Sequence, residues 1–312
     1  MKLFVTGATG YIGAVVVERA VRAGHAVEGL ARNQEGAAKV AQLGATPIVG
    51  DLQSFDTLAA AAARADAVLH LAYIHDFSLD YSIVIDTEVK AVTALAKGAQ
   101  SKPIITTSGT ALAAPATGGG ETDETAPIYE GFVLSQRIQA ERAVLDLAKQ
   151  GGHVVAVRLP PYVYGRGGSF FVPMLMQQAA EHGVSVWIEG PATRTSDVDV
   201  DDVARFYLAA AERAPAGSLY NCTGETDVTT RQLAEAIGQA VGVPARGLPR
   251  AEIEKLWGEF LTAFVDYENR ASSLKARREL GWRPQARYGL MDDITKGSYS
   301  EMAKQLRQKG AK

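Results

Sequence analysis

The chain has 312 residues, of which 47% are hydrophobic and 21% are charged. This apolar content excludes an intrinsically disordered chain, and the length fits one large α/β domain or two interleaved ones. The 32 basic and 35 acidic residues nearly cancel, so we do not expect the basic surface of a nucleic-acid-binding protein.

Cysteine and histidine are scarce. Cys222 is the single cysteine, which excludes an internal disulfide and a cysteine-based zinc site. The five histidines are scattered without a His-x-x-x-His pair, so no metal site is expected. No apolar run is long enough to span a bilayer, and we expect a cytoplasmic protein without a membrane partner.

Short β-rich runs alternate with longer Ala- and Leu-rich stretches over the first 160 residues. This alternation predicts a doubly wound parallel sheet, a Rossmann fold of the α/β class. In chain order, strands are expected at 3–6, 26–31, 46–49, 67–71, 103–107 and 153–158, and helices at 12–23, 55–65, 82–99 and 131–150. Residues 1–160 are expected to form a dinucleotide-binding domain, and residues 161–312 a smaller substrate domain that is partly interleaved with it.

A glycine-rich turn follows the first predicted strand directly and opens the first helix. Its glycines, spaced as Gly-x-x-Gly-x-x-Gly, allow a tight turn and a close approach of the backbone to a pyrophosphate. The start of the helix adds free N–H groups and a partial positive charge. The predicted dinucleotide contacts in this turn are Gly7, Thr9, Gly10, Tyr11, Ile12 and Gly13.

The end of the second predicted strand indicates which dinucleotide binds. An NAD site usually places Asp or Glu there to hold the ribose 2′-hydroxyl, whereas the 2′-phosphate of NADP requires a cation. Here Ala31 stands in place of the acid, and Arg32 and Asn33 follow, which favours NADP over NAD. The alternative for Arg32 is a solvated charge at the start of a helix. Asp51 and Leu52, past the third strand, are expected at the adenine, unless Asp51 caps the next helix.

Motifs along almost the whole chain resemble those of the extended short-chain dehydrogenases/reductases, a superfamily of NAD(P)-dependent epimerases, dehydratases and reductases. The matching segments are 6–13, 50–52, 70–72, 158–165, 199–204, 220–221 and 280–284. The resemblance implies a homodimer formed through two long helices of each subunit. It also places Leu71, Ala72 and Tyr73 beside the nicotinamide ribose, and Pro160 in the loop that contacts the nicotinamide.

The chain departs from this family at the residues that carry its chemistry. Members use Tyr-x-x-x-Lys, in which the tyrosine exchanges a proton with the substrate and the lysine lowers the pKa of the tyrosine. None of the eleven tyrosines here is followed by lysine four residues later. Depending on the alignment, the two positions hold Val133 and Arg137, or Phe132 and Gln136. Arg137 would then hold the ribose hydroxyls, or would be a solvated residue of the helix.

Two further family positions differ as well. The serine of the family corresponds to Ser108 or, in a second alignment, to Gly109, and its asparagine is replaced by Glu88. The resemblance therefore implies an atypical member that keeps the dinucleotide fold without the usual catalytic set.

Other side chains are candidates for the proton transfer. His75 follows the fourth strand, next to Asp76, and an imidazole there can act as acid or base near neutral pH. Tyr129 lies one turn before the position of the family tyrosine, and Tyr162 lies in the loop that contacts nicotinamide and substrate. Together with Ser108, these three form the predicted catalytic set. An ordinary structural role is the alternative for each.

These observations predict an oxidoreductase that exchanges a hydride between NADP(H) and a small, fairly apolar carbonyl compound or alcohol. The apolar run 170–176 favours such a substrate, unless it is a core helix of the second domain. A nucleotide-sugar epimerase or dehydratase is the first alternative, although Thr195 and Ser196 stand where such enzymes usually carry Arg-Asp. A dinucleotide-binding sensor or scaffold without turnover is the second.

Overall fold

Seven parallel strands form the central sheet of the computed structural model, which describes residues 1–75, 79–131, 135–191 and 193–310. The strand order β11-β6-β5-β4-β1-β2-β3 reverses between β1 and β4, and this switch point opens a crevice at the carboxyl ends of the strands. The predicted doubly wound α/β fold is confirmed. The strands are β1 (Lys2–Thr6), β2 (Ala26–Ala31), β3 (Thr46–Val49), β4 (Ala67–His70), β5 (Ile104–Gly109), β6 (Val154–Leu159) and β11 (Leu219–Asn221).

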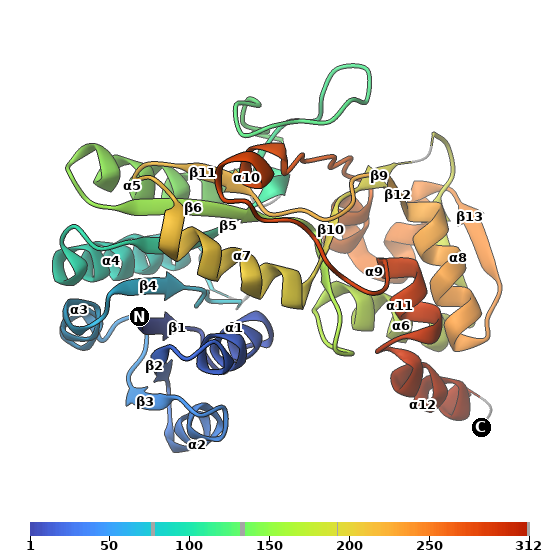
Figure 1. Cartoon of the computed structure of the whole chain (residues 1–312). Coiled ribbons are helices and arrows are strands. Elements are labelled where there is room, and N and C mark those ends of the chain that lie inside the picture. The colour runs from blue at the N-terminus through green and yellow to red at the C-terminus, as the bar shows by residue number, and fades with distance from the viewer. Residues whose placement is uncertain (76–78, 132–134, 192, 311–312) are drawn as a thin grey trace.

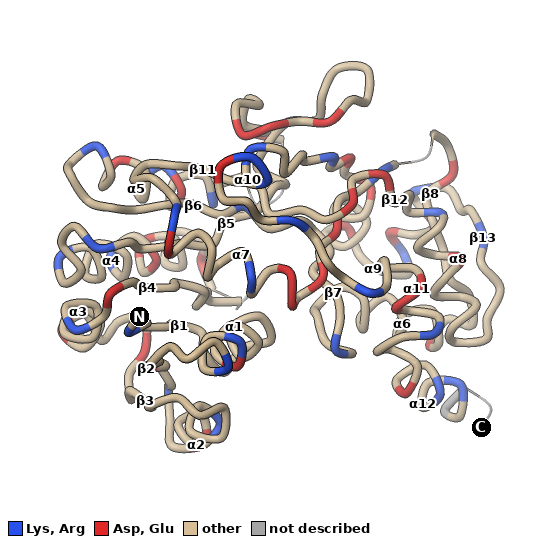
Figure 2. Tube along the Cα trace, viewed as in Figure 1, with Lys and Arg blue, Asp and Glu red and all other residues tan. Residues whose placement is uncertain are grey.

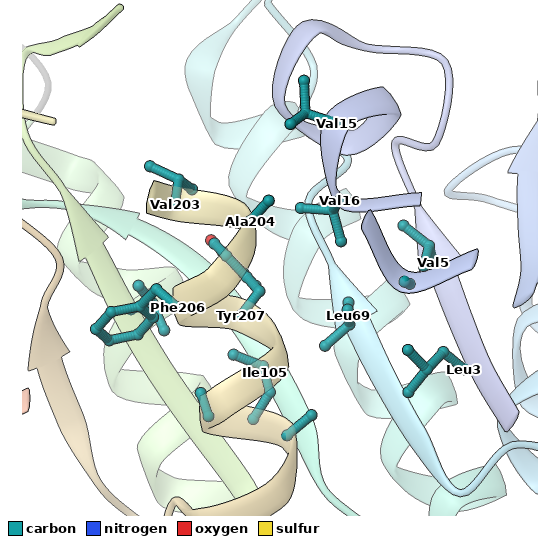
Figure 3. Close-up of a cluster of buried hydrophobic side chains, with 14 of the residues drawn as sticks. Leu3, Val5, Val15, Val16, Leu69, Ile105, Val203, Ala204, Phe206 and Tyr207 are labelled. Carbon is teal, nitrogen blue, oxygen red and sulfur yellow. The ribbon is translucent and has the colours of Figure 1, made fainter. Parts of the chain in front are cut away.

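Helices cover both faces of this sheet (Figure 1). One face carries α1 (Tyr11–Arg22), α2 (Gln34–Gln42) and α7 (Val200–Arg213), and the other carries α3 (Phe55–Arg64), α4 (Tyr81–Ala99) and α5 (Ile138–Lys149). Neighbouring strand residues point to opposite faces, so Val5 packs beneath α1 and α7 while Phe4 packs beneath α3 and α4. Figure 3 shows the first of these cores, in which Val16 of α1 lies near Val5 of β1 and Leu69 of β4. Phe206 of α7 packs against Tyr220 of β11 and Trp282 in the same core.

One predicted helix begins later than expected. The helix predicted over 131–150 is α5, which starts at Ile138 after a short 3₁₀ turn, η2 (Ser135–Arg137). The buried residues that define its inner face, among them Ala140 and Val144, occur only from residue 140 onward. Gly131 lowers helix propensity at the predicted start. Arg137 therefore precedes α5, and Phe132 and Val133 lie outside the described residues.

The C-terminal half contributes to two layers. α7 and β11 return to the sheet, whereas α6 (Phe171–His182), α8 (Thr230–Val241) and α11 (Leu290–Lys296) enclose a second core that we call the cap (Figure 1). Within the apolar run 170–176, Val172, Leu175 and Met176 are buried in the cap, as the core-helix alternative predicted. The remaining elements are β7 (Tyr162–Tyr164), β8 (Ser185–Ile188), β9 (Arg194–Thr195), β10 (Asp197–Asp199), β12 (Val228–Thr229), β13 (Ala245–Leu248), η1 (Thr110–Leu112), α9 (Arg250–Val265), α10 (Leu274–Glu279) and α12 (Ser300–Gly310).

Charged residues of both signs are interspersed over the sheet layer and the cap (Figure 2). Many of them pair locally along helices, as Lys90 does with Asp86 on α4 at 2.7 Å. Within the described ranges, no helix has the length and apolarity needed to cross a bilayer.

Candidate active site

The glycine turn after β1 has no room for side chains at two of its glycines. Gly7 has φ +69°, and a Cβ there would lie 2.7 Å from the backbone nitrogen of Ala72. A Cβ on Gly13 would overlap the carbonyl oxygen of Gly7. Gly10 is the N-cap of α1 and has no side chain that could bind the first-turn N–H groups of the helix. This cradle fits the pyrophosphate of a dinucleotide.

Three side chains of the same turn have different surroundings. Thr9 is exposed, and Ile12 packs partly against the core beneath α1. The hydroxyl of Tyr11 donates to the carbonyl oxygen of Gly165 at 2.8 Å, and burial raises the pKa of this phenol. The Tyr11 side chain therefore attaches the loop after β7 to α1, which leaves only its backbone N–H for a ligand.

Arg32 is the cation at the end of β2. It is exposed, and no hydrogen bond or ion pair joins it to the described part of the chain. The side chain of Asn33 accepts the N–H of Gly36 at 2.9 Å and caps α2. Glu35, the next carboxylate along the chain, pairs with Lys39 at 2.8 Å. The guanidinium of Arg32 is thus available to an anionic ligand.

Asp51 and Leu52 follow β3. The Asp51 carboxylate accepts the hydroxyl of Ser54 at 2.8 Å and the N–H of Gln53 at 2.9 Å, and these bonds lower its pKa. Leu52 is buried in the core beneath α3. Asp51 therefore stabilises the turn that leads into α3, but the N-cap of α3 is Ser54, so Asp51 does not cap the helix as the alternative proposed.

A buried chain of hydrogen bonds joins the ends of β1 and β4. The N–H of Ala72 donates to the Thr6 hydroxyl at 3.2 Å, and the Thr6 hydroxyl lies 2.8 Å from Nδ1 of His70. Nε2 of His70 lies 3.1 Å from Oε1 of Glu88 on α4. A neutral imidazole that donates from Nε2 and accepts at Nδ1 satisfies all three contacts. This chain of hydrogen bonds positions Leu71 and Ala72, both half-buried, against the glycine turn.

A second group of side chains lies next to these hydrogen bonds and consists of Tyr73, Tyr81, Arg137 and His75. The Tyr73 and Tyr81 hydroxyl oxygens are 2.7 Å apart, and the Arg137 guanidinium carbon is 4.1 Å from the centre of the Tyr73 ring. The His75 ring makes an edge contact with Tyr73, with 5.0 Å between ring centres. Burial raises the pKa of Tyr73, and the Arg137 charge opposes part of this increase. Desolvation by the groups around it, followed by the Arg137 charge, lowers the pKa of His75, whose side chain is exposed.

Ser108 is committed to a buried ion pair. Its hydroxyl donates to Oε2 of Glu141 at 2.6 Å, and Arg158 holds the same carboxylate through Nε at 2.9 Å and Nη2 at 2.5 Å. All three residues are buried. Ser108 thus faces α5, while Gly109, its alternative, is half-buried at the end of β5.

Tyr129 and Tyr162 lie on either side of an aromatic group that joins the sheet to the cap. Tyr129 stacks on Tyr267, and Phe171 stacks on Phe264 with 3.9 Å between ring centres. Tyr162 makes an edge contact with Phe171 and is 1% exposed. Within the described residues its hydroxyl has no hydrogen-bond partner, and burial raises its pKa.

The structure therefore separates the predicted catalytic residues. It brings His75 to Tyr73 and Arg137, and it places Tyr129 and Tyr162 around the aromatic group. Pro160 is buried at the end of β6, and Asp76 lies outside the described residues. Sequence reasoning missed Tyr81, which no motif marks because only the fold brings it to Tyr73.

Comparisons with known proteins agree with this geometry. Residues 3–223 match the model of the NAD dependent epimerase/dehydratase family. An uncharacterised protein of Schizosaccharomyces pombe is 36% identical over 301 residues, which cover 96% of this chain and 100% of the relative. The 4-hydroxy-2-methyl-3-oxo-4-farnesyl-3,4-dihydroquinoline-1-oxide ketoreductase of Stigmatella aurantiaca is 30% identical over 311 residues, which cover 90% of this chain and 92% of the relative.

A solved structure extends the similarity to the fold. The crystal structure of gox2253 superposes with a TM-score of 0.78 at 25% identity and covers 96% of this chain and 98% of its own. Because the family match spans the glycine turn, the strands around the crevice and β11, the chain belongs to the NAD dependent epimerase/dehydratase family, the extended short-chain dehydrogenases/reductases.

Proposed function

We propose that this protein is an NADP(H)-dependent oxidoreductase that exchanges a hydride with a small, fairly apolar carbonyl compound or alcohol. The observation that carries the proposal is the glycine cradle, with Ala72 packed against it and Tyr73 next along the chain. Nicotinamide supplies or accepts the hydride when it is bound. The chain must bind the dinucleotide, orient the substrate and move one proton.

The N–H groups of the first turn of α1 would hold the pyrophosphate, and Arg32 would hold the 2′-phosphate. Arg32 is suited to this role because it has no partner in the described chain and because Ala31 removes the carboxylate that would repel the phosphate. Arg137, at the position of the family lysine in one of the two alignments, would lie beside the nicotinamide ribose.

We assign the role of proton donor to the substrate to the hydroxyl of Tyr73. Its raised pKa keeps this hydroxyl protonated at neutral pH, so it can donate to a carbonyl oxygen. Arg137 over the ring face stabilises the tyrosinate that forms, and the Tyr81 hydroxyl can donate to it. The lowered pKa of His75 leaves a neutral imidazole at neutral pH, which is better suited to accept a proton than to donate one.

The other predicted donors are less well placed. Ser108 already donates to Glu141, and the Tyr162 hydroxyl is enclosed in the cap. Tyr129 instead stacks on Tyr267 in the aromatic group, and Phe170, which is 53% exposed, contacts Phe171 of the same group. Such surfaces suit an apolar substrate. The Stigmatella relative, named as a ketoreductase of a farnesyl-bearing dihydroquinoline, supports a carbonyl on an apolar molecule.

A fluorescence titration with NADPH and NADH tests the binding of the dinucleotide. We expect tighter binding of NADPH, and Arg32→Ala should weaken NADPH about 10- to 100-fold, the value of one charge-assisted contact to phosphate, without changing NADH. Arg22→Ala is the matched control, because Arg22 is an exposed arginine at the other end of α1. Tighter binding of NADH by the wild type would contradict the assignment of Arg32.

Catalysis is tested by measuring NADPH oxidation with each compound of a panel of ketones, aldehydes and quinones. Tyr73→Phe should lower kcat by roughly 10²- to 10⁴-fold and leave NADPH affinity unchanged. His75→Ala, Tyr129→Phe and Tyr162→Phe serve as comparisons. A wild-type rate in Tyr73→Phe, with a loss in one of the others, would transfer the donor role to that residue. Tight binding of NADPH without turnover on the whole panel would favour a sensor.

The proposal includes a cytoplasmic homodimer. The exposed face of α4 carries Ile83, 51% exposed, among polar residues such as Asp86 and Lys90. The molar mass in solution, measured by light scattering, should be twice that of one chain. Ile83→Asp should convert the dimer to a monomer if this face is the interface.

A further inference from the structure

The segment between β7 and α6 leads the chain into the cap, and we call its residues 165–170 the linking segment. Two of its non-glycine residues have a positive φ, Arg166 at 53° and Ser169 at 107°. Such conformations are strained for residues with a side chain, persist only where the surroundings hold them, and gather at functional sites. The shape of the linking segment therefore points to a functional role.

Residues of the cap hold the backbone of the linking segment from one side. The Tyr299 hydroxyl accepts the N–H of Gly165 at 3.1 Å and donates to the carbonyl oxygen of Gly168 at 2.7 Å. The hydroxyl of Ser298 accepts the N–H of Gly167 at 2.8 Å. Both hydroxyls lie directly before α12, so these bonds fix the linking segment to the cap.

Arg166 attaches the linking segment to the sheet layer from the other side. Its Nε donates to Oδ2 of Asp201 on α7 at 2.8 Å, and its Nη2 donates to Oδ1 at 2.6 Å. Its Nη1 donates to Oε2 of Glu18 on α1 at 2.6 Å. A guanidinium held by two carboxylates in this way is fixed in direction as well as in place. These ion pairs offset the strain at Arg166.

The linking segment lies against the glycine turn. The Tyr11 hydroxyl donates to the carbonyl oxygen of Gly165 at 2.8 Å, and a Cβ on Gly168 would overlap the ring of Tyr11. The backbone at Gly168 is therefore packed on the residue that follows Gly10 in the cradle. Phe170 is only two residues further on, so its Cα lies within about 7 Å of that of Gly168.

Phe170 ends the linking segment with an exposed ring. It is 53% exposed, and it makes an edge contact with Phe171 at 5.0 Å between ring centres. Phe171 stacks on Phe264 of the aromatic group, which also packs against Ala111 just after β5. Phe170 therefore lies between the glycine turn and the aromatic group, where a planar ring of a substrate can stack on it.

We propose that Phe170 selects substrates that carry an aromatic ring, by stacking against that ring, and that the linking segment holds Phe170 in position for this contact. The inference rests on the proposed function, because it names the substrate class of the same site. Phe170 is the residue that determines specificity. Arg166 is a positioning residue, since it acts on the substrate through the linking segment.

Two ketones of similar size test the preference for an aromatic ring. Acetophenone and cyclohexyl methyl ketone both carry a methyl ketone on a six-membered ring, and only the first ring is aromatic. Phe170→Leu keeps an apolar side chain but removes the ring face. It should raise KM for acetophenone about 3- to 10-fold, the value of one aromatic pair, and leave KM for the saturated ketone and the affinity for NADPH unchanged.

Two further variants control for this substitution. Phe170→Tyr restores a ring and should have the KM values of the wild type for both ketones. Leu274→Ala changes another exposed apolar side chain, 65% exposed at the start of α10, and should leave both KM values unchanged.

Arg166→Ala tests the positioning of Phe170, because it removes the bonds to Glu18 and Asp201 and leaves the ring of Phe170 intact. It should raise KM for acetophenone by a similar factor and leave KM for the saturated ketone unchanged, whereas a merely structural role would affect both ketones equally. Arg166→Lys keeps the charge and should restore part of the preference. Arg22→Ala is the matched control, since Arg22 pairs with the same Glu18 at 2.6 Å from within α1.

Phe170→Leu decides the question even if Arg166→Ala fails to fold. An unchanged KM for acetophenone in Phe170→Leu, or an equal rise for both ketones, would overturn the inference while the proposed function stands.

Failure of the wild type to oxidise NADPH with any compound would instead refute the proposed function. Ligand-observed NMR of the two ketones with the NADPH complex then tests the stacking alone. Weaker binding of acetophenone by Phe170→Leu, with the saturated ketone unaffected, is expected. Equal binding of acetophenone by the wild type and Phe170→Leu would overturn the inference.

Discussion

Asp197 on β10 offers a quantitative test of the structure. This aspartate is 1% exposed, and no hydrogen bond reaches its Oδ2 from the described residues. The N–H of Glu225 donates to Oδ1 over a long 3.4 Å. Burial, followed by repulsion from Glu225 and Asp199, raises the pKa of Asp197 from 3.8 to about 7. The folded protein therefore binds a proton at Asp197 more tightly than the unfolded chain does.

This difference makes stability depend on pH. Below pH 3.8 Asp197 is protonated in both states and costs the fold nothing. As pH rises from about 4 through about 7, the unfolded chain releases the proton first, and the folded state loses stability. The difference between 3.8 and about 7 corresponds to a ceiling of about 4 kcal/mol, at about 1.4 kcal/mol for each tenfold change. Local relaxation around the charge reduces this figure.

Asp197→Asn removes the titration and keeps the shape of the side chain. Urea unfolding at intervals from pH 5 to 8.5 should show the variant gaining on the wild type by up to about 3 kcal/mol, the part of the ceiling that falls between pH 5 and about 7, with most of the gain complete by pH 8. Asp86→Asn is the control, because it makes the same substitution at an exposed aspartate. A stability difference between Asp197→Asn and the wild type that stays constant from pH 5 to 8 would refute the reasoning.

Two other substitutions have defined outcomes. Gly13→Ala should abolish NADPH binding in a fluorescence titration, because its Cβ overlaps the carbonyl oxygen of Gly7 and forces the turn open. Gly289→Ala is the control, because Gly289 has space for a Cβ and a negative φ, and this variant should bind NADPH normally. Gly24 also has space for a Cβ, but its positive φ makes it unsuitable as a control. Ser108→Ala should lower the free energy of unfolding by about 2 kcal/mol, the value of a hydrogen bond to a charged group, and leave NADPH affinity unchanged. A loss of turnover without a loss of stability would instead assign Ser108 to catalysis.

The sheet and the glycine turn could be predicted from sequence because their signals are local. Each strand of the sheet up to β6 is a short apolar run between turn residues, and each predicted strand lies within a residue or two of the observed one. Gly7 and Gly13 mark a turn in which a Cβ does not fit, so their spacing alone indicates the cradle. The start of α5 was wrong by seven residues, because alternatives at a helix start differ by little free energy and packing against β6 decides between them.

The arrangement of the site depends on contacts between segments far apart in the chain. Ser108 faces Glu141 because successive side chains of a strand alternate between faces, and sequence alone left the register open between Ser108 and Gly109. Tyr73 meets Tyr81 and Arg137 only because β4, α4 and η2 converge at one edge of the sheet. The sequence by itself thus determined the class of fold and the place of the glycine cradle, since glycine turns and strand periodicity are properties of neighbouring residues. Only the tertiary structure decided which hydroxyls and charges lie together beside the glycine cradle, because long-range packing sets the direction of each side chain.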